Sequence, residues 1–456
     1  MLNSLRIQNF KSWKDTDTIE FGSLTGFFGT NSSGKTSILQ FLLMLKQTVE
    51  SSDRLQILNL GDERSYVDLG TLYDVVHQRK DPAEITFKVE WKLLIDEAFS
   101  PKHLRKFTWA NYKNTFESKI RKRGDHISLQ NYHYRSKERS FTLQMTGQDY
   151  ETSSPIYSLL TEGLTDPHSH EAVRFPQRYV EINKFYGMPS GFALPAGQYD
   201  QIARMVFEFE QLFKRTYYLG PLREYPNRLY VWGGEQPEGV GNRGEKAVAA
   251  LLYSKRLATI KIQDNVFRTL EEHVAYWLEE LGMIHSFEVR PIAPNRKEYE
   301  VRIKRTAESA EVFLTDVGFG VSQLLPVLVL LFYVPEGSTI ILEQPEIHLH
   351  PAVQAGLADV FIDAIKRRNV QIILESHSEH LLQRLQRRLA EEALPTEQVK
   401  LYFTDFVGAA STLTPLDLDE YGNIRNWPNN FFGDSFADAS AMMDAELKRR
   451  EAAGEK

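Results

Sequence analysis

The stretch GTNSSGKT, residues 29–36, fits the pattern G-x-x-x-x-G-K-[ST] of a phosphate-binding loop (P-loop). Its glycines allow backbone angles that a Cβ would forbid, so the loop can wrap a phosphate with its amides pointing inward. Lys35 supplies a cation to the β- and γ-phosphates, and the Thr36 hydroxyl is placed to bind Mg²⁺. A strand-like apolar segment (23–29) precedes the loop, and residues 36–49 repeat apolar residues at helical spacing. This order of strand, loop and helix N-terminus predicts that the chain binds a nucleoside triphosphate.

Composition narrows the class of protein. The 456 residues include 54 Lys+Arg and 61 Asp+Glu, and the formal net charge of −7 argues against a generally basic nucleic-acid coat. Cysteine is absent, which excludes disulfides, thiolate metal sites and cysteine nucleophiles. The N-terminus lacks the apolar core of a signal peptide, and the longest apolar run, residues 324–334, is too short to span a bilayer. We therefore expect a cytoplasmic protein without a membrane partner.

A P-loop site needs an acidic residue at the end of a neighbouring strand to hold the Mg²⁺ shell. Glu343, which ends the buried strand TIILE at residues 339–343, is the candidate. The next residue often polarises the attacking water, but here it is Gln344, whose amide orients water and cannot accept its proton. Glu346 is a second candidate for that role. His377, after the next buried strand, is placed to sense a γ-phosphate through a hydrogen bond.

A second glycine-rich segment lies at LTDVGFGVSQLLPVL, residues 314–328. Gly318, Gly320 and Ser322 precede an apolar helix that we expect to start near Gln323. Such a helix N-terminus is a second phosphate-binding end. One chain rarely needs two phosphate-binding helix ends for one nucleotide. Two chains packed head-to-tail would use both, because each chain would close the nucleotide site of the other. The alternative is an ordinary N-capped helix.

Alternation of apolar and polar residues predicts antiparallel strands at residues 84–95, 126–136 and 139–147. Between the first two lies a basic segment, 101–125, with interleaved aromatic residues. It could hold a nucleic-acid backbone while its rings stack on bases, or it could be a solvated amphipathic face. The basic residues at issue are Lys119, Arg121, Lys122 and Arg123.

A long irregular stretch at residues 217–248 is rich in Gly, Pro and Arg. Its arginines Arg223, Arg228 and Arg243 could reach a phosphate or a partner chain, or the stretch could simply pack the insertion on the core. Further on, buried strands alternate with helices across residues 311–382. This order predicts a doubly wound α/β core.

Together these motifs resemble the ABC-type ATPases of the SMC, RecF and OLD group. GTNSSGKTS is similar to the group's Walker A, LTDVGFGVSQ to its signature loop, TIILEQPEIHLHP to its Walker B and D-loop, and LESHS to its switch-histidine loop. The opening RIQNFKSWKD is also typical. YLGPLREYPNR, EQPE and the tail GNIRNWPNNFF most resemble bacterial OLD-like AAA ATPases with a DUF3696 tail. The resemblance covers nearly the whole chain except residues 90–200.

The resemblance implies ATP and Mg²⁺ as cofactors, with Thr36 and Glu343 on the metal side and catalytic roles at Glu343, Gln344 and His377. It implies trans contacts to a partner's nucleotide from Gly318, Gly320, Ser322 and Gln323. The expected nucleotide-binding residues are Gly29, Asn31, Ser32, Ser33, Gly34, Lys35, Thr36 and Ser37. Most relatives carry a glutamate at the position of Gln344, so a closed ATP-held dimer with slow turnover is expected.

We therefore predict an α/β P-loop NTPase with an ABC-type head and a β-rich and helical insertion between Walker A and the signature. The predicted division is an N-terminal lobe at 1–88, the insertion at 89–300, a C-terminal lobe at 301–410 and a DUF3696-like tail at 411–456. The leading functional hypothesis is an ATPase that forms a homodimer or higher homo-oligomer. It would regulate a separate effector, a nuclease or toxin, in anti-phage defence. The alternative is a RecF-like DNA-binding ATPase of repair or recombination.

Overall fold

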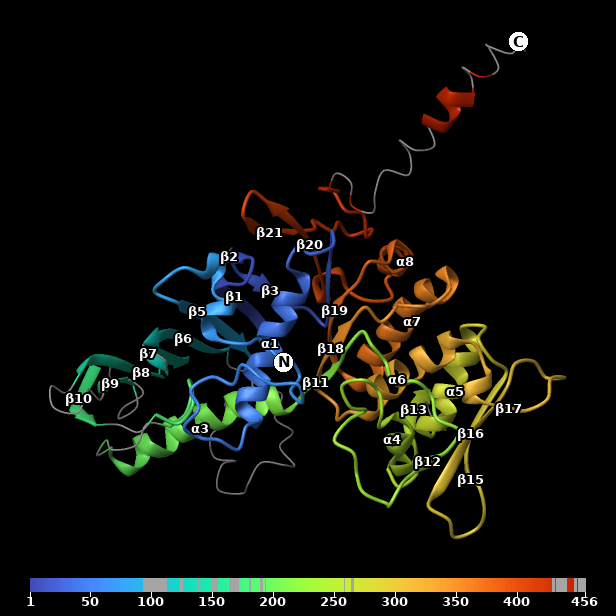
Figure 1. The fold of residues 1–456 in the computed structure, drawn as a ribbon, viewed down its shortest axis with the longest axis horizontal. Helices are drawn as coiled ribbons and strands as arrows, with labels where there is room; N and C mark the ends of the chain where they lie inside the picture. The colour runs from blue at the N-terminus through green and yellow to red at the C-terminus, as the bar shows by residue number, and fades with distance from the viewer. Residues whose placement is uncertain are drawn as a thin grey trace.

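A computed structural model describes most of the chain, and its two largest sheets are shown in Figure 1. The described residues are 1–92, 113–123, 126–137, 139–148, 155–163, 172–179, 182–188, 192, 194–257, 259–263, 266–428, 431, 441–446 and 449.

A six-stranded sheet forms the core behind the P-loop. Its strands run in the order β11-β18-β19-β4-β20-β21, and all neighbours are parallel except the last pair. Every residue of β4, β18 and β19 is buried, as expected for parallel strands covered on both faces. The bounds are β4 Leu24–Gly29, β11 Thr216–Leu219, β18 Thr339–Glu343, β19 Gln371–Glu375, β20 Val399–Val407 and β21 Ala410–Pro415.

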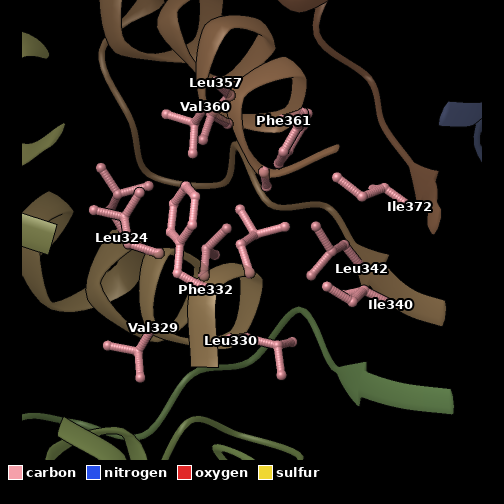
Figure 2. Packing of buried hydrophobic residues seen from close by; sticks show 14 of the residues in the cluster. Leu324, Val329, Leu330, Phe332, Ile340, Leu342, Leu357, Val360, Phe361 and Ile372 are labelled. Carbon is pink, nitrogen blue, oxygen red and sulfur yellow. The ribbon is translucent and has the colours of Figure 1, made fainter. Parts of the chain in front are cut away.

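Helices cover both faces of this sheet because side chains alternate along each strand. Ile340 and Leu342 belong to the hydrophobic cluster that contains α6 and α7, whereas Ile341 belongs to the cluster that contains α1. Figure 2 shows Phe332 of α6 lying toward Leu357, Val360 and Phe361 of α7, beside the strand residues Ile340, Leu342 and Ile372. The helices that follow core strands or pack on them are α1 Lys35–Glu50, α6 Phe319–Tyr333, α7 Pro351–Arg368 and α8 Glu379–Ala390.

The second sheet is antiparallel and has nine strands. Its order is β10-β9-β8-β7-β6-β5-β1-β2, with β3 also paired to β1. The expected antiparallel strands near residues 84, 126 and 139 are confirmed in it, and the predicted domain boundary at residue 88 falls within β5. The bounds are β1 Leu2–Phe10, β2 Trp13–Asp15, β3 Ile19–Glu20, β5 Glu84–Trp91, β6 Asn114–Arg123, β7 His126–Ser136, β8 Arg139–Gln148, β9 Pro155–Glu162 and β10 Ala172–Tyr179; α3 Ala196–Lys214 contacts α1.

A helical lobe with two small sheets connects β11 to α6. Its helix α5 begins at Leu270. Thr269, the residue after β14, is the N-cap and forms a capping box with Glu272, which fixes the start of the helix. The lobe's elements are α4 Ala247–Ser254, α5 Leu270–Glu280, β12 Tyr230–Val231, β13 Ile260–Gln263, β14 Val266–Arg268, β15 Ser286–Pro291, β16 Glu298–Lys304 and β17 Val312–Phe313.

The short elements and the tail complete the described structure. The ring of Phe431 packs edge-on against Phe28 and Phe403, at centroid distances of 6.0 and 5.0 Å, which attaches the tail to the core sheet. Among the described residues, we find no helix with the length and apolar character needed to cross a membrane. The short helices are α2 Leu72–Val75, η1 His77–Arg79, η3 Leu314–Asp316 and η4 Thr396–Gln398.

The order of elements confirms the α/β P-loop fold predicted from the sequence, with β-rich and helical segments between the P-loop and the signature region.

Candidate functional site

The P-loop follows β4 and is shaped by two glycines that no other residue could replace without strain. Gly29 has φ 137° and Gly34 has φ 99°, both in the region that disfavours a Cβ. A Cβ on Gly29 would lie 2.1 Å from the Thr404 carbonyl oxygen, and one on Gly34 would lie 2.6 Å from Ser411 Oγ. The strand β20 and the β20–β21 hairpin therefore form the wall against which the loop closes.

Lys35 and Thr36 lie at the start of α1, as the motif predicts. The Lys35 side chain is buried, and its Nζ donates to the carbonyl oxygens of Gly29 at 3.0 Å and Thr30 at 2.7 Å. Burial lowers the pKa of Lys35, while the charges of Glu375 and Glu346 act in the opposite direction. Thr36 Oγ1 donates to Glu375 Oε1 at 3.0 Å.

Of the remaining P-loop residues, one contacts β20 and the others face solvent or begin α1. Ser33 is buried, and its hydroxyl lies 2.6 Å from Thr404 Oγ1. Asn31 and Ser32 are exposed at the tip, and Ser37 lies in the first turn of α1. This segment leads directly into the N-terminus of a 16-residue helix with Gly34 as its N-cap, the kind of helix end that favours a bound anion.

Two carboxylates stand at the ends of neighbouring strands. Glu343 ends β18 and Glu375 ends β19, and the parallel register places them side by side. Burial, together with the Glu375 charge, raises the pKa of Glu343 to about 7, although a hydrogen bond from the Tyr218 hydroxyl at 3.1 Å favours its ionised form. Sequence reasoning missed Glu375, yet the repeated segment IILE at 340–343 and 372–375 was a usable signal.

The segment after Glu343 is bonded to the end of β19 and to the loop that follows it. Gln344 has a left-handed backbone (φ 43°), and its backbone N–H donates to the Glu375 carbonyl oxygen at 2.9 Å. Glu346 is buried, and its Oε1 accepts from the His377 backbone N–H at 2.7 Å. Burial, and to a smaller extent the charge of Lys35, lowers the pKa of His377.

A buried arginine, Arg223, also belongs to this cluster. It follows β11, the next strand beyond β18, and its side chain is 4% exposed. Its charge acts on Tyr218, Glu343 and Glu346, and burial lowers its pKa to about 10. The sequence singled out Arg223 only as one of three arginines, because nothing local indicated that it would be buried.

The signature region is near the expected place, but its helix starts one turn early. Helix α6 begins at Phe319 with Gly318 as N-cap, so the predicted start near Gln323 was wrong. The physical reason is that Ser322 does not cap the helix: its hydroxyl donates back to the Phe319 carbonyl at 2.8 Å. Ser322 and Gln323 are buried, whereas Gly318 is exposed and Gly320 is half-buried.

The described part of the basic segment is a strand of the antiparallel sheet. Lys119 pairs with Glu84 at 2.7 Å, and Phe116 lies in the core with no exposed surface. Arg121 and Lys122 are half-buried. The side chain of Arg123 and residues 101–112 lie outside the described residues.

The residues fit a Mg²⁺–nucleotide. The two glycines form a cradle that a Cβ would fill, and Glu375 Oε2 is buried without a hydrogen-bond partner among the described residues, beside the Thr36 hydroxyl. When bound, the metal would supply a Lewis acid at the phosphates, held from the protein side by Thr36 and the strand-end carboxylates. Within the described chain, no group of three or more His, Asp or Glu side chains could hold a metal ion by themselves.

Two family models match the chain. The AAA ATPase domain matches residues 1–188 and 246–382, and the protein of unknown function DUF3696 matches residues 394–441. No curated protein matched.

Several SMC head domains are among the similar solved structures. A SmcHead bound to the C-winged helix domain of ScpA is 11% identical, with 91% of this chain and 98% of that chain covered at a TM-score of 0.44. The SMC head domain from Thermotoga maritima is 11% identical, with coverage of 91% and 99% and a TM-score of 0.35. The Smc head domain with an extended coiled coil, bound to the C-terminal domain of ScpA from Pyrococcus furiosus, is 11% identical, with coverage of 91% and 96% and a TM-score of 0.43.

Proposed function

Because the chain belongs to the AAA ATPase domain family, we propose that it is a slowly hydrolysing ATPase whose ATP-bound form closes into a nucleotide-sandwich dimer and regulates a separate effector. ATP and Mg²⁺ would bind at the P-loop, with Lys35 on the phosphates and with Thr36 and Glu343 toward the metal. His377 would contact the γ-phosphate, since its ring is already within electrostatic reach of Lys35.

The proposal of slow turnover rests on one observation, the position of Gln344. It directly follows the buried Glu343 and its backbone is fixed by the hydrogen bond to the Glu375 carbonyl. An amide at this position can orient a water molecule but cannot accept its proton. The neighbouring carboxylate of Glu346 is buried and holds the His377 backbone N–H through Oε1, while its Oε2 has no hydrogen-bond partner among the described residues. We assign it a role in positioning the loop that carries His377 rather than the role of the base.

The head-to-tail dimer is supported by the separation of the two helix ends. Helix α1 buries its apolar face in one hydrophobic cluster and α6 in the other. The exposed Gly318 at the N-terminus of α6 is therefore available to a nucleotide held by a second copy. Gly320, Ser322 and Gln323 would shape this end, with Ser322 acting through its buried position in the first turn.

A separate effector, a nuclease or toxin in anti-phage defence, is the partner that the family resemblance implies. The exposed aromatic residues of the DUF3696 segment support this part of the proposal. Its Tyr421 and Trp427 are 64% and 46% exposed, while Phe431 attaches the segment to the core. Exposed aromatic residues of this kind are frequent anchors in protein interfaces.

The RecF-like alternative predicts duplex DNA binding through Lys119, Arg121, Lys122 and Arg123. The Lys119–Glu84 ion pair and the buried Phe116 count against it in the described part of that segment.

The test is native mass and phosphate release with ATP·Mg²⁺, for the full chain and for Ser322→Arg, with Lys35→Ala as the control that should not bind the phosphates. We expect ATP to double the mass of the wild type only, with little phosphate released. An unchanged wild-type mass would refute the dimer. Turnover that duplex DNA stimulates, and that is lost on neutralising the four basic residues, would instead favour the RecF-like alternative.

A further inference from the structure

Arg223 lies in the connection that leaves the core sheet for the helical lobe. Strand β11 ends at Leu219, next to β18 in parallel register, so the residues after it emerge at the same sheet edge as Glu343, Glu375 and the P-loop. In open α/β sheets this edge is where ligands bind. The connection is held in place by backbone hydrogen bonds from Gly220 to Asn242 at 2.8 Å and from Glu224 to Arg243 at 2.8 Å.

The guanidinium of Arg223 is buried with all its donors unused. Nε, Nη1 and Nη2 are each inaccessible and have no hydrogen-bond partner among the described residues. Burying an arginine without acceptors is costly, because each N–H has lost its water. The nearby carboxylates offset the charge without bonding to it. Glu343 Oε1 accepts from the Tyr218 hydroxyl and Glu346 Oε1 from the His377 N–H, whereas Glu346 Oε2 is itself buried with no hydrogen-bond partner among the described residues.

The position of Glu346 relates Arg223 to the P-loop. The Glu346 carboxylate interacts electrostatically with Lys35 and with Arg223. The two cations therefore face one buried carboxylate, Lys35 from the β4 side of the sheet and Arg223 from the β11 side. An anion bound by Lys35 at this edge would lie near the same carboxylate as the unused donors of Arg223.

We propose that Arg223 binds the γ-phosphate of ATP within its own chain and thereby lets the site distinguish ATP from ADP. The proposal rests on the ATP binding in the proposed function and adds a residue to it. A guanidinium suits this role because its planar fork donates two parallel hydrogen bonds to phosphate oxygens, which an ammonium cannot do.

The experiment compares the binding of AMP-PNP·Mg²⁺ and ADP·Mg²⁺ to the full-length wild type, Arg223→Met and Arg223→Lys by calorimetry. The matched control is Arg243→Met, an exposed arginine of the same connection. We expect Arg223→Met to weaken AMP-PNP at least about tenfold, with ADP changed less than about twofold, because the lost charge-assisted bonds reach only the third phosphate. Arg223→Lys should weaken AMP-PNP less, and Arg243→Met should change neither affinity.

A purely structural role gives a different result. In that case both affinities would fall together, or neither would change, and either outcome overturns the proposal. The thermal midpoint of each variant without nucleotide shows whether the variant folds. If Arg223→Met does not fold, Arg223→Lys decides the question, because it keeps the positive charge beside Glu343 and Glu346. The quantity compared is then its ratio of AMP-PNP affinity to ADP affinity. A wild type that dimerises with AMP-PNP while the Arg223 variants keep that ratio refutes this inference alone. Selective AMP-PNP loss without dimerisation refutes only the dimer.

Discussion

Individual residues set the chemistry of the site through burial. Glu343, Glu346 and Glu375 are all buried at one sheet edge, and burial raises the pKa of each carboxyl. Lys35 and Arg223 supply the opposing charges. The residue that would complete hydrolysis, the base after Glu343, is the amide Gln344. Under the proposed function, the site would hold a phosphate chain and would be poorly equipped to activate water.

Restoring the base should therefore accelerate hydrolysis. We expect Gln344→Glu to raise kcat by about 10²-fold or more, since a positioned general base contributes on that scale. The measurement is steady-state phosphate release from ATP·Mg²⁺. Gln344→Ala is the control and should stay as slow as the wild type. Equal turnover in the wild type and Gln344→Glu would show that another group already serves as the base.

The raised pKa of Glu343 predicts a pH-dependent cost to folding. Its carboxyl has a pKa near 4.5 when unfolded and about 7 when folded, so the fold favours the neutral form. That preference stabilises the protein below pH 4.5 and is lost as the pH rises to 7. Glu343→Gln, which is always neutral, should gain up to about 3 kcal/mol in unfolding free energy over the wild type at pH 8, and much less at pH 5.

Urea denaturation of both proteins at pH 5 and pH 8 measures this difference, with the exposed Glu420→Gln as control. If Glu343→Gln were destabilised equally at pH 5 and pH 8, the wild-type fold would require the ionised carboxylate of Glu343 at both pH values.

At the scale of elements, one side chain joins the two large sheets. Gln371, at the start of β19, accepts from the Leu2 N–H at 2.9 Å and donates to the Leu2 carbonyl at 2.8 Å. Its Nε2 also donates to the Gly22 carbonyl at 2.9 Å, and its Oε1 accepts from Thr339 Oγ1 at 3.1 Å. This amide therefore fixes β1, the strand that begins the antiparallel sheet, on the core that carries the P-loop.

Gln371→Leu should leave the two Leu2 backbone groups buried and unpaired. We expect a loss of about 2–4 kcal/mol in unfolding free energy, because each orphaned group costs about 1–3 kcal/mol. Chemical denaturation measures it. The control is Gln398→Leu, whose exposed side chain accepts from Ser23 Oγ at 3.1 Å and should cost less than about 0.5 kcal/mol. Similar losses for both variants would contradict the joining role of Gln371.

At the scale of the molecule, the core sheet separates two hydrophobic clusters. The cluster on one face contains α1 and most of the antiparallel sheet, and the other contains α6, α7 and the helical lobe. Figure 1 shows the same division, with the P-loop helix α1 beside the blue and green strands and α6 beside the orange helices. The P-loop helix and the helix of residues 319–333 therefore lie on opposite faces of the sheet, which is why the proposed function joins them across a dimer.

Two inactive variants should accordingly complement each other. We expect Lys35→Ala and Ser322→Arg, each in a Gln344→Glu background, to be inactive alone. Mixed in equal amounts they should recover about a quarter of the parental phosphate release, since half of the dimers would contain one intact composite site out of two. No recovery in a mixture shown to contain heterodimers would mean that the two motifs do not share a site.

The sequence by itself determined the elements whose signals are local. GTNSSGKT predicted the P-loop because its glycines and Lys35 act within eight residues, and the buried strand TIILE predicted Glu343 at a strand end. The start of α6 was missed by one turn, because the Ser322 hydroxyl could either cap a helix or bond back into it, and both follow from the same letters.

Only the tertiary structure decided which distant residues meet. Glu375 stands beside Glu343 because β18 and β19 pair in parallel register, and Arg223 joins them because β11 is the next strand. The burial of Arg223 depends on the packing of a connection that shows no regular pattern in its sequence. Local patterns specify backbone conformation, whereas burial and charge pairing arise from contacts between segments that are distant in the sequence. Arg223 and Glu343, for example, lie more than a hundred residues apart.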